Sequence, residues 1–189
     1  MKSLCRIAAL LAFAGCAATW AASEVAAPTE PPTYTYRKID GKALSAHVFF
    51  PAVHGAQNRA SAILLFHGGG WSAGSPEWTF DAARRFADAG LVAIAIEYRL
   101  SEGEVTPIEA LDDVCSAFDW THKNAEDLGL AGRIAGYGVS AGGHLVALAG
   151  TRGCAANGAR PDALLLWSPA LDARRCSRPS PGSRIRTSR

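Results

Sequence analysis

The stretch GYGVSAGGHL, residues 136–145, contains a serine whose neighbours favour nucleophilic chemistry. Gly138, Ser140 and Gly142 match the pattern G-x-S-x-G, in which a serine occupies a sharp turn between a strand and a helix. An apolar segment precedes the pattern and a segment with helical spacing follows it, as the motif requires. Such a turn exposes the hydroxyl at the N-terminus of a helix, where developing negative charge is favoured. Ser140 is therefore the candidate nucleophile.

A second glycine-rich stretch, His67-Gly68-Gly69-Gly70-Trp71, directly follows a continuous apolar run. A glycine-rich turn after a buried strand can aim several backbone N–H groups at one point. The tetrahedral intermediate of acyl transfer carries an oxyanion that needs such donors. Alone, the stretch is equally compatible with a flexible turn. Together with the serine motif, it predicts an oxyanion-binding loop.

A serine hydroxyl becomes a good nucleophile only when a base takes its proton, and that base needs an acid to orient it. The sequence has five histidines: His47, His54, His67, His122 and His144. Only His144 follows the serine. Because it lies one helical turn further on, we expect it to pack or hydrogen-bond beneath the turn. His67 belongs to the glycine-rich loop and is expected to be a structural anchor.

Predicted strands alternate with predicted helices along the chain. Apolar or alternating segments predict strands, and helical spacing predicts helices: strands at 34–39, 43–50, 60–66, 91–96, 133–139 and 163–167, and helices at 75–89, 107–123 and 141–150. Asp40-Gly41 predicts a turn that pairs the first two strands as a hairpin. The later alternation implies right-handed parallel crossovers, so the predicted fold class is an α/β sandwich.

The N-terminus has the features of an export signal. Lys2 and Arg6 precede an apolar run at 7–14, and small residues lead to a cleavage site near 21–23. The run is too short to span a bilayer, and a buried N-terminal helix is the alternative. The residues that end at Cys16 resemble a bacterial lipobox, so lipid attachment there is a second possibility. We expect a secreted or periplasmic protein, whose one candidate membrane anchor is Cys16.

Export would bring the cysteines into an oxidising compartment. Ordinary cleavage leaves Cys115, Cys154 and Cys176, and an odd number cannot all pair within one chain. A bond between Cys115 and Cys154 is conceivable, but the sequence does not decide it. No cysteine or histidine spacing indicates a metal site, and no cofactor is expected.

Charge and composition set residues 173–189 apart. The formal net charge is +2, but six arginines lie in this segment with no acid, which leaves 13 basic and 17 acidic residues elsewhere. Nothing in the rest of the chain suggests a nucleic-acid partner. The segment has almost no apolar residues. A disordered basic tail is one interpretation. A frameshift or misplaced stop codon is the one we favour, because Arg, Ser, Pro and Gly dominate misread GC-rich DNA.

In combination, HGGGW (67–71), YRLSEGEVTP (98–107) and GVSAGGHL (138–145) resemble α/β-hydrolases of the hormone-sensitive-lipase-like branch. Within it, the sequence is most similar to bacterial secreted carbohydrate acetyl and feruloyl esterases. The resemblance covers residues 37–172. It implies an α/β-hydrolase sandwich with a mostly parallel central sheet, which here lacks its last strands. The implied substrate is a small-molecule or carbohydrate ester.

The resemblance also implies roles for individual residues. Ser140 would be the nucleophile, and the amides of Gly69, Gly70 and Ala141 would form the oxyanion hole. Trp71 would lie beside the acyl pocket, with core packing as its alternative role.

The family's catalytic acid and histidine follow the serine in that order, and neither has a matching position here. Asp162 precedes the strand 163–167, at the wrong end of the sheet, and Asp172 follows it one strand too early. Asp112 and Asp113 are better explained by surface exposure or pairing along their helix. With the last strands missing, 163–167 becomes an apolar edge that favours aggregation. We therefore expect marginal solubility.

Three hypotheses remain from the sequence. The first is a serine carboxylesterase, with an amidase such as a formamidase as the variant that shares its machinery. The second is a truncated, inactive remnant, and the third is a non-catalytic binding protein. The expected organisation is a signal peptide at 1–22 and a linker at 23–36. The N-terminal part of an α/β-hydrolase domain follows at 37–172, and an aberrant or disordered tail at 173–189.

Overall fold

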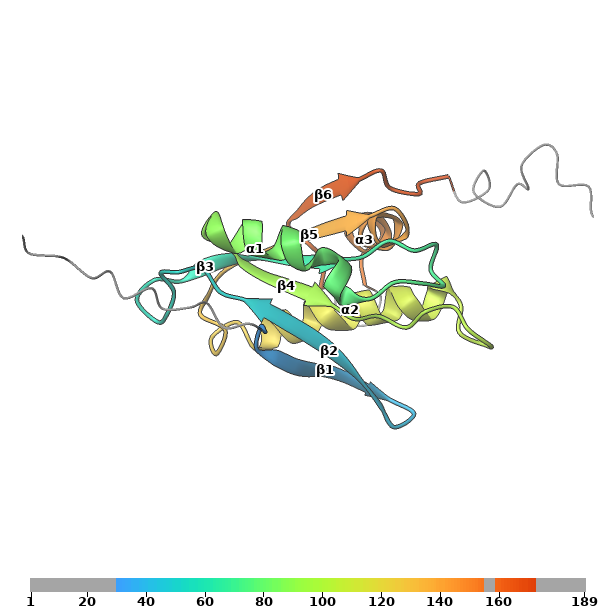
Figure 1. Cartoon of the computed structure of the whole chain (residues 1–189), viewed down its shortest axis with the longest axis horizontal. Coiled ribbons are helices and arrows are strands. Elements are labelled where there is room, and N and C mark those ends of the chain that lie inside the picture. The colour runs from blue at the N-terminus through green and yellow to red at the C-terminus, as the bar shows by residue number, and fades with distance from the viewer. Residues whose placement is uncertain (1–29, 155–158, 173–189) are drawn as a thin grey trace, which may run out of the picture.

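A six-stranded sheet with helices on both faces forms the body of the protein (Figure 1). The structure is a computed structural model that describes residues 30–154 and 159–172. Its strands are β1 (Thr33–Ile39), β2 (Lys42–Phe49), β3 (Ala60–Phe66), β4 (Val92–Ile96), β5 (Leu130–Val139) and β6 (Ala163–Trp167). Its helices are η1 (Pro76–Thr79), α1 (Phe80–Asp88), α2 (Pro107–Lys123) and α3 (Ala141–Arg152).

The strand order is β1-β2-β4-β3-β5-β6. β1 and β2 form the predicted antiparallel hairpin, whose turn residues Asp40 and Gly41 have φ of 48° and 79°. Such paired positive φ values suit a tight hairpin. β2 also pairs antiparallel with β4, whereas β4, β3, β5 and β6 are mutually parallel. The predicted α/β sandwich with a mostly parallel sheet is therefore confirmed.

Both faces of the central strands are buried, which explains their continuous apolar runs. Ile63 and Leu65 of β3 pack toward α1, whereas Leu64 and Phe66 face the larger core beneath α2 and α3. Phe118 of α2 lies in that larger core, with its ring centroid 5.9 Å from that of Phe66.

Helix α2 has the bounds that its sequence predicts, and its first residues explain why it begins there. Thr106 precedes Pro107, and its hydroxyl accepts a hydrogen bond from the Ile108 amide at 3.2 Å. Glu109 reaches back to accept from the Thr106 amide at 2.7 Å. This reciprocal cap satisfies donors that the first turn of a helix leaves free.

Two predicted elements differ from the structure by more than one residue at the N-terminal ends of their α-helix or strand. The segment 75–89 begins as the short 3-10 helix η1 and becomes α-helical only at Phe80. β5 begins at Leu130, three residues earlier than predicted, because the Ala60 end of β3 pairs with it there. In addition, β1 begins at Thr33, within the stretch expected to be a linker.

A disulfide joins Cys115 of α2 to Cys154 just after α3, with Cα atoms 5.4 Å apart. It links the two helices of one face and settles the pairing that the sequence left open. Among the described residues, no helix is both long and apolar enough to cross a bilayer. The predicted signal peptide, the candidate anchor Cys16, Cys176 and the basic tail lie outside the described residues.

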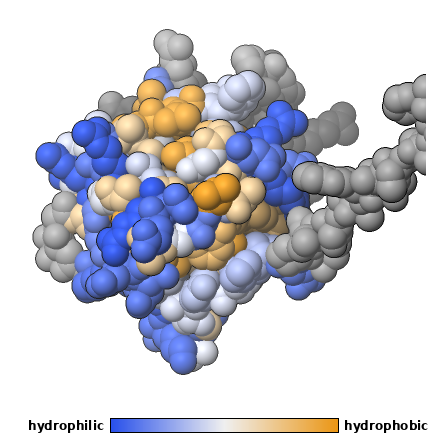
Figure 2. Space-filling model, turned by 90° about the vertical axis from the view of Figure 1, so that its left-hand side faces the viewer, coloured by the Kyte–Doolittle hydropathy of each residue, from blue (hydrophilic) through white to orange (hydrophobic). Residues whose placement is uncertain are grey.

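β6 is an apolar strand at the edge of the described sheet. Leu164, Leu165 and Trp167 are 37%, 42% and 68% exposed. Figure 2 views the molecule from the amino ends of the parallel strands and shows that apolar patches interrupt the hydrophilic surface on that face as well. The exposed edge agrees with the sequence analysis, whereas marginal solubility stays a prediction.

Candidate active site

Ser140 lies on a strained turn between β5 and α3, which we call the serine turn (residues 138–142). Its φ and ψ are 50° and −112°. A non-glycine residue in so sparsely populated a region costs on the order of 1–3 kcal/mol and persists only where its surroundings hold it. The Ser140 amide donates to the carbonyl of Trp167 at 3.0 Å, and its own carbonyl accepts from the amide of Ala170 at 3.1 Å. The segment that contains β6 thus supports the serine turn from outside.

The glycines of the serine turn allow three backbone segments to meet. A Cβ atom on Gly138 would lie 2.6 Å from the carbonyl carbon of Gly142. A Cβ on Gly142 would overlap the carbonyl oxygens of Phe66 and His67 at the end of β3. Because only glycine lacks this atom, the motif is explained here by close approach between α3 and the two strands.

The glycine-rich stretch 67–71, the glycine turn, lies directly against the serine turn. β3 and β5 are parallel and Phe66 pairs with Gly138, so the carboxyl ends of the two strands adjoin. A Cβ on Gly68 would lie 3.3 Å from the Cβ of Ser140. Two motifs that are far apart in sequence therefore meet at one point, as both the fold and the sequence motifs predict.

Three amides near Ser140 are free to donate to a ligand. Among the described residues, the amides of Gly69 and Gly70 have no backbone acceptor. Ala141 is the first residue of α3, and the first N–H groups of a helix have no partner within it. A carbonyl oxygen bound here would also experience the favourable end of the helix dipole.

His67 anchors the glycine turn and is not arranged as a base. Its Nδ1–H donates to the carbonyl of Gly68 at 2.6 Å, and the Tyr98 hydroxyl donates to the His67 carbonyl at 2.8 Å. The two rings stack with centroids 4.3 Å apart. Burial lowers the pKa of His67 and raises the pKa of Tyr98, so both side chains remain neutral at pH 7.

Trp71 and His144 pack against each other beside the serine turn. Their ring centroids are 5.4 Å apart in an edge-to-face arrangement. Burial, followed by repulsion from Arg152, lowers the pKa of His144. Within residues 30–154 and 159–172, Trp71 Nε1 and His144 Nδ1 have no hydrogen-bond partner. His144 therefore packs, as one of its two expected roles, and does not bond to the serine.

All five histidines of the sequence lie among the described residues, and none hydrogen-bonds to the Ser140 hydroxyl. His47 lies on β2 beside Thr33, 3.0 Å from its hydroxyl, and His54 lies 3.0 Å from the carbonyl of Leu128. His122 is exposed near the end of α2.

Among the acids, Asp162 accepts from the Ile134 amide at 2.7 Å, near the amino end of β5. In the described part of the chain, no cluster of three or more acidic, histidine or cysteine side chains is arranged to hold a metal.

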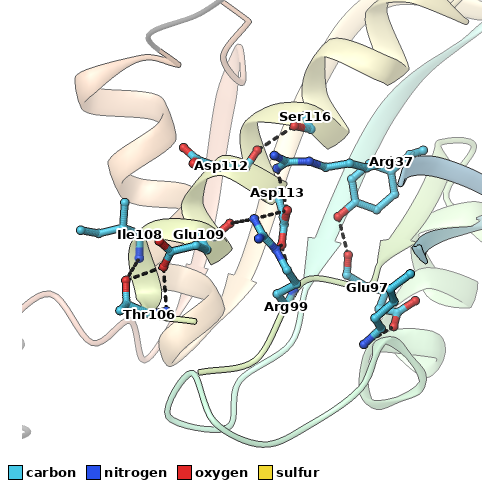
Figure 3. A network of polar contacts seen from close by, with 11 residues as sticks. Arg37, Glu97, Arg99, Thr106, Ile108, Glu109, Asp112, Asp113 and Ser116 are labelled. Atoms are coloured by element: carbon cyan, nitrogen blue, oxygen red, sulfur yellow. Dashed lines mark hydrogen bonds and ion pairs between the residues drawn. The ribbon is translucent and has the colours of Figure 1, made fainter. Parts of the chain in front are cut away.

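The interpretation of Asp113 as a surface or helix-paired residue is wrong. Its carboxylate is fully buried and pairs with Arg37 of β1 and Arg99, which follows β4 (Figure 3). The sequence contained a signal, because Asp113 falls on the same helical face as the buried Ala110 and Val114. A charged residue on such a face is almost always paired.

Comparison with known proteins identifies the family. A family model described as an alpha/beta hydrolase fold matches residues 63–187. The chain belongs to this family. The match continues past Asp172 into the segment expected to be an aberrant or disordered tail, whose nature stays a prediction.

Several esterases are similar to this family member. Esterase LipI of Mycobacterium tuberculosis is 31% identical over 70% of the chain, and an ethyl acetate hydrolase of Pseudomonas putida is 34% identical over 75%. The propionate-bound esterase Est2 of Thermogutta terrifontis superposes with a TM-score of 0.70 at 32% identity over 75% of the chain. The chain spans 42%, 45% and 55% of the lengths of these three proteins.

Proposed function

We propose that this chain carries the nucleophile and the oxyanion hole of a carboxylic ester hydrolase that acts on small acyl esters. The observation that carries the proposal is Ser140 at φ 50° on a strand-to-helix turn, in contact with the glycine turn. The names of its relatives support the same chemistry, since they include esterases, an ethyl acetate hydrolase and a propionate-bound structure.

In the proposed reaction, the Ser140 hydroxyl oxygen attacks the ester carbonyl carbon while its proton passes to a base. The carbonyl electron pair moves onto oxygen, and the amides of Gly69, Gly70 and Ala141 donate hydrogen bonds to the resulting oxyanion. The bond to the alcohol then breaks, and the alcohol leaves with a proton. Water hydrolyses the acyl-serine by the same steps, with Trp71 beside the acyl group.

The 189 residues by themselves are proposed to be inactive. A serine hydroxyl remains a poor nucleophile at neutral pH without a base. The sequence has five histidines, and no imidazole among them contacts the Ser140 hydroxyl. Added imidazole would supply the missing base from solution.

The test measures p-nitrophenyl acetate cleavage by the chain and by Ser140→Ala, with and without added imidazole. Imidazole reacts with this ester directly, so the alanine variant gives the background. We expect no difference without imidazole, and with imidazole a Ser140-dependent rate and an acetyl group on Ser140 by mass spectrometry. Equal rates with imidazole and no acetylated serine would refute the proposed nucleophile. Serine-dependent turnover without imidazole would refute the proposed inactivity.

The acyl group and the location are finer proposals. Acetyl and feruloyl esters of carbohydrates are the proposed natural substrates, and comparison of p-nitrophenyl acetate with methyl ferulate tests the acyl preference. p-Nitroacetanilide as a third substrate distinguishes an amidase. Export to the periplasm or medium, with lipid attachment at Cys16 as the candidate anchor, is tested by fractionating cells that express the chain and a Cys16→Ala variant.

A further inference from the structure

The glycine turn needs support from outside itself. Gly69, Gly70 and Trp71 have consecutive positive φ values of 117°, 63° and 65°. Trp71 is the costly one, because a bulky side chain disfavours this region. Directly after the turn, the amides of Ser72 and Ala73 donate to the Gly69 carbonyl at 3.3 and 3.0 Å. The Ser72 bond closes a tight turn whose two central residues are Gly70 and Trp71, and contacts from outside the turn add to this local closure.

The segment 98–101 supplies those contacts at both ends of the glycine turn. The Tyr98 hydroxyl donates to the carbonyl of His67, the first residue of the turn, at 2.8 Å. The Ser101 amide donates to the carbonyl of Trp71, its last residue, at 2.7 Å. The segment itself has no helical or strand structure. Its own position must therefore be held by side chains.

Arg99 lies between these two contacts and is bound to Asp113. The Arg99 amide and Nε both donate to Asp113 Oδ2 at 2.9 Å. One guanidinium nitrogen donates to Asp113 Oδ1 and to the carbonyl of Glu109, both at 3.0 Å. The Asp113 side chain has no exposed surface, and Figure 3 shows it between the two guanidinium groups. Charge-assisted bonds of this kind are about twice as strong as neutral ones.

We propose that Arg99 and Asp113 are positioning residues for the glycine turn. The buried carboxylate holds both the backbone and the side chain of Arg99. Tyr98 and Ser101 then transmit that position to His67 and Trp71. The consequence for catalysis rests on the proposed function, in which Gly69 and Gly70 donate to the oxyanion.

Arg37 provides a matched control. It donates to Asp113 Oδ1 at 2.6 Å, but it comes from β1 and is not among the partners of segment 98–101. Arg99→Gln and Arg37→Gln each remove one positively charged partner of the Asp113 carboxylate. Only Arg99→Gln also removes the side-chain bonds that hold segment 98–101 in position. A purely structural role for the ion pairs predicts the same pattern of change for both variants.

The experiment measures amide hydrogen exchange of Ser72, Ala73 and Ser101 in the 189-residue chain by NMR, normalised to the amides of β3. In Arg99→Gln we expect these amides to exchange about tenfold faster, and in Arg37→Gln by less than about twofold. Equal acceleration in the two variants, or acceleration of β3 by the same factor, overturns the proposal. Arg99→Lys and Arg37→Lys carry the same comparison if the glutamine variants do not fold.

Imidazole-supported acyl transfer, measured on the same samples, separates this proposal from the proposed function. A Ser140-dependent rate that falls in Arg99→Gln and not in Arg37→Gln supports both. If no variant transfers an acyl group but exchange at Ser101 still distinguishes them, the proposed function fails and the positioning role stands. If exchange is unchanged in Arg99→Gln, the positioning role fails whatever the acyl-transfer result.

Discussion

Two strained turns meet at the candidate site, and they are held in different ways. The serine turn has two hydrogen bonds with the β6 segment, but its distinguishing feature is close packing, because Gly138 and Gly142 leave no room for a single added carbon between backbone segments. The glycine turn depends on hydrogen bonds from segment 98–101, whose position depends in turn on a buried ion pair. A turn held by packing tolerates little change, whereas a turn held by hydrogen bonds can loosen gradually.

Loss of the disulfide is expected to have the largest effect, and to act on both turns. Cys115 and Cys154 are 39 residues apart and link α2, which carries Asp113, to the end of α3, which begins at the serine turn. The chain-entropy model gives about 4 kcal/mol for a loop of this length. The double serine variant should lose about this much in urea-induced unfolding compared with the oxidised chain. A loss below about 1 kcal/mol would mean that removing the disulfide adds little conformational entropy to the unfolded chain.

Gly142→Ala tests the packing of the serine turn. The added Cβ would overlap the carbonyl oxygens of Phe66 and His67, so we expect a loss of about 3 kcal/mol in the free energy of unfolding. Gly70→Ala is the control, because nothing lies within 4 Å of its Cβ position. Only its φ of 63° opposes alanine, at about 1 kcal/mol. Similar losses in urea titrations of the two variants would contradict a serine turn held by packing.

Tyr98→Phe tests the hydrogen bonding of the glycine turn. It leaves the carbonyl of His67 without the Tyr98 donor, which should cost about 1–2 kcal/mol and shift the indole N–H resonance of Trp71. Thr121→Val is the control, since this buried hydroxyl donates to the carbonyl of Ala117 at 2.8 Å, within α2 and away from segment 98–101. It should cost a similar amount and leave the Trp71 signal unchanged. A Trp71 shift in both variants would show that the effect is not local.

Acid should weaken the surroundings of both turns through His67 and His144. Burial lowers the pKa of each histidine in the folded chain, so below about pH 6.5 the unfolded chain binds more protons. Stability is then present in full above about pH 6.5 and falls as the pH drops, by less than about 1.4 kcal/mol per pH unit for each histidine. Urea unfolding between pH 5 and 7.5 measures the slope. Replacement of His67 by Gln should flatten it, and an unchanged slope would mean that His67 does not contribute to it.

Leu165→Lys is expected to have the smallest effect on stability and to reveal how β6 behaves at the edge behind the serine turn. Leu165 is 42% exposed, so the free energy of unfolding should change by less than about 0.5 kcal/mol. The charge should reduce edge-to-edge association and raise the soluble fraction measured by light scattering. Val53→Lys is the control, because Val53 is 72% exposed and lies outside the strands. Equal gains from both variants would mean that net charge alone governs solubility.

Local patterns in the sequence were enough to predict much of the fold and part of the site. The apolar runs at 60–66 and 163–167 have the bounds of β3 and β6, and α2 has its predicted bounds. The two glycine-containing motifs identified the turns that meet at Ser140. These predictions succeeded because strand and helix patterns depend on neighbours within a few residues, and each glycine motif is itself a short local pattern.

Only the tertiary structure decided which distant side chains support those turns. The sequence analysis did not anticipate Asp113 between Arg37 and Arg99, 76 and 14 residues away, and it left the Cys115–Cys154 bond open. The stacking of His67 on Tyr98 likewise joins a residue that follows β3 to one that follows β4. Periodicity indicates which face of an element is buried, but a partner far along the chain is chosen by the packing of the whole sheet and its helices. For that reason the candidate nucleophile could be identified from the sequence, and the residues that hold its surroundings in position could not.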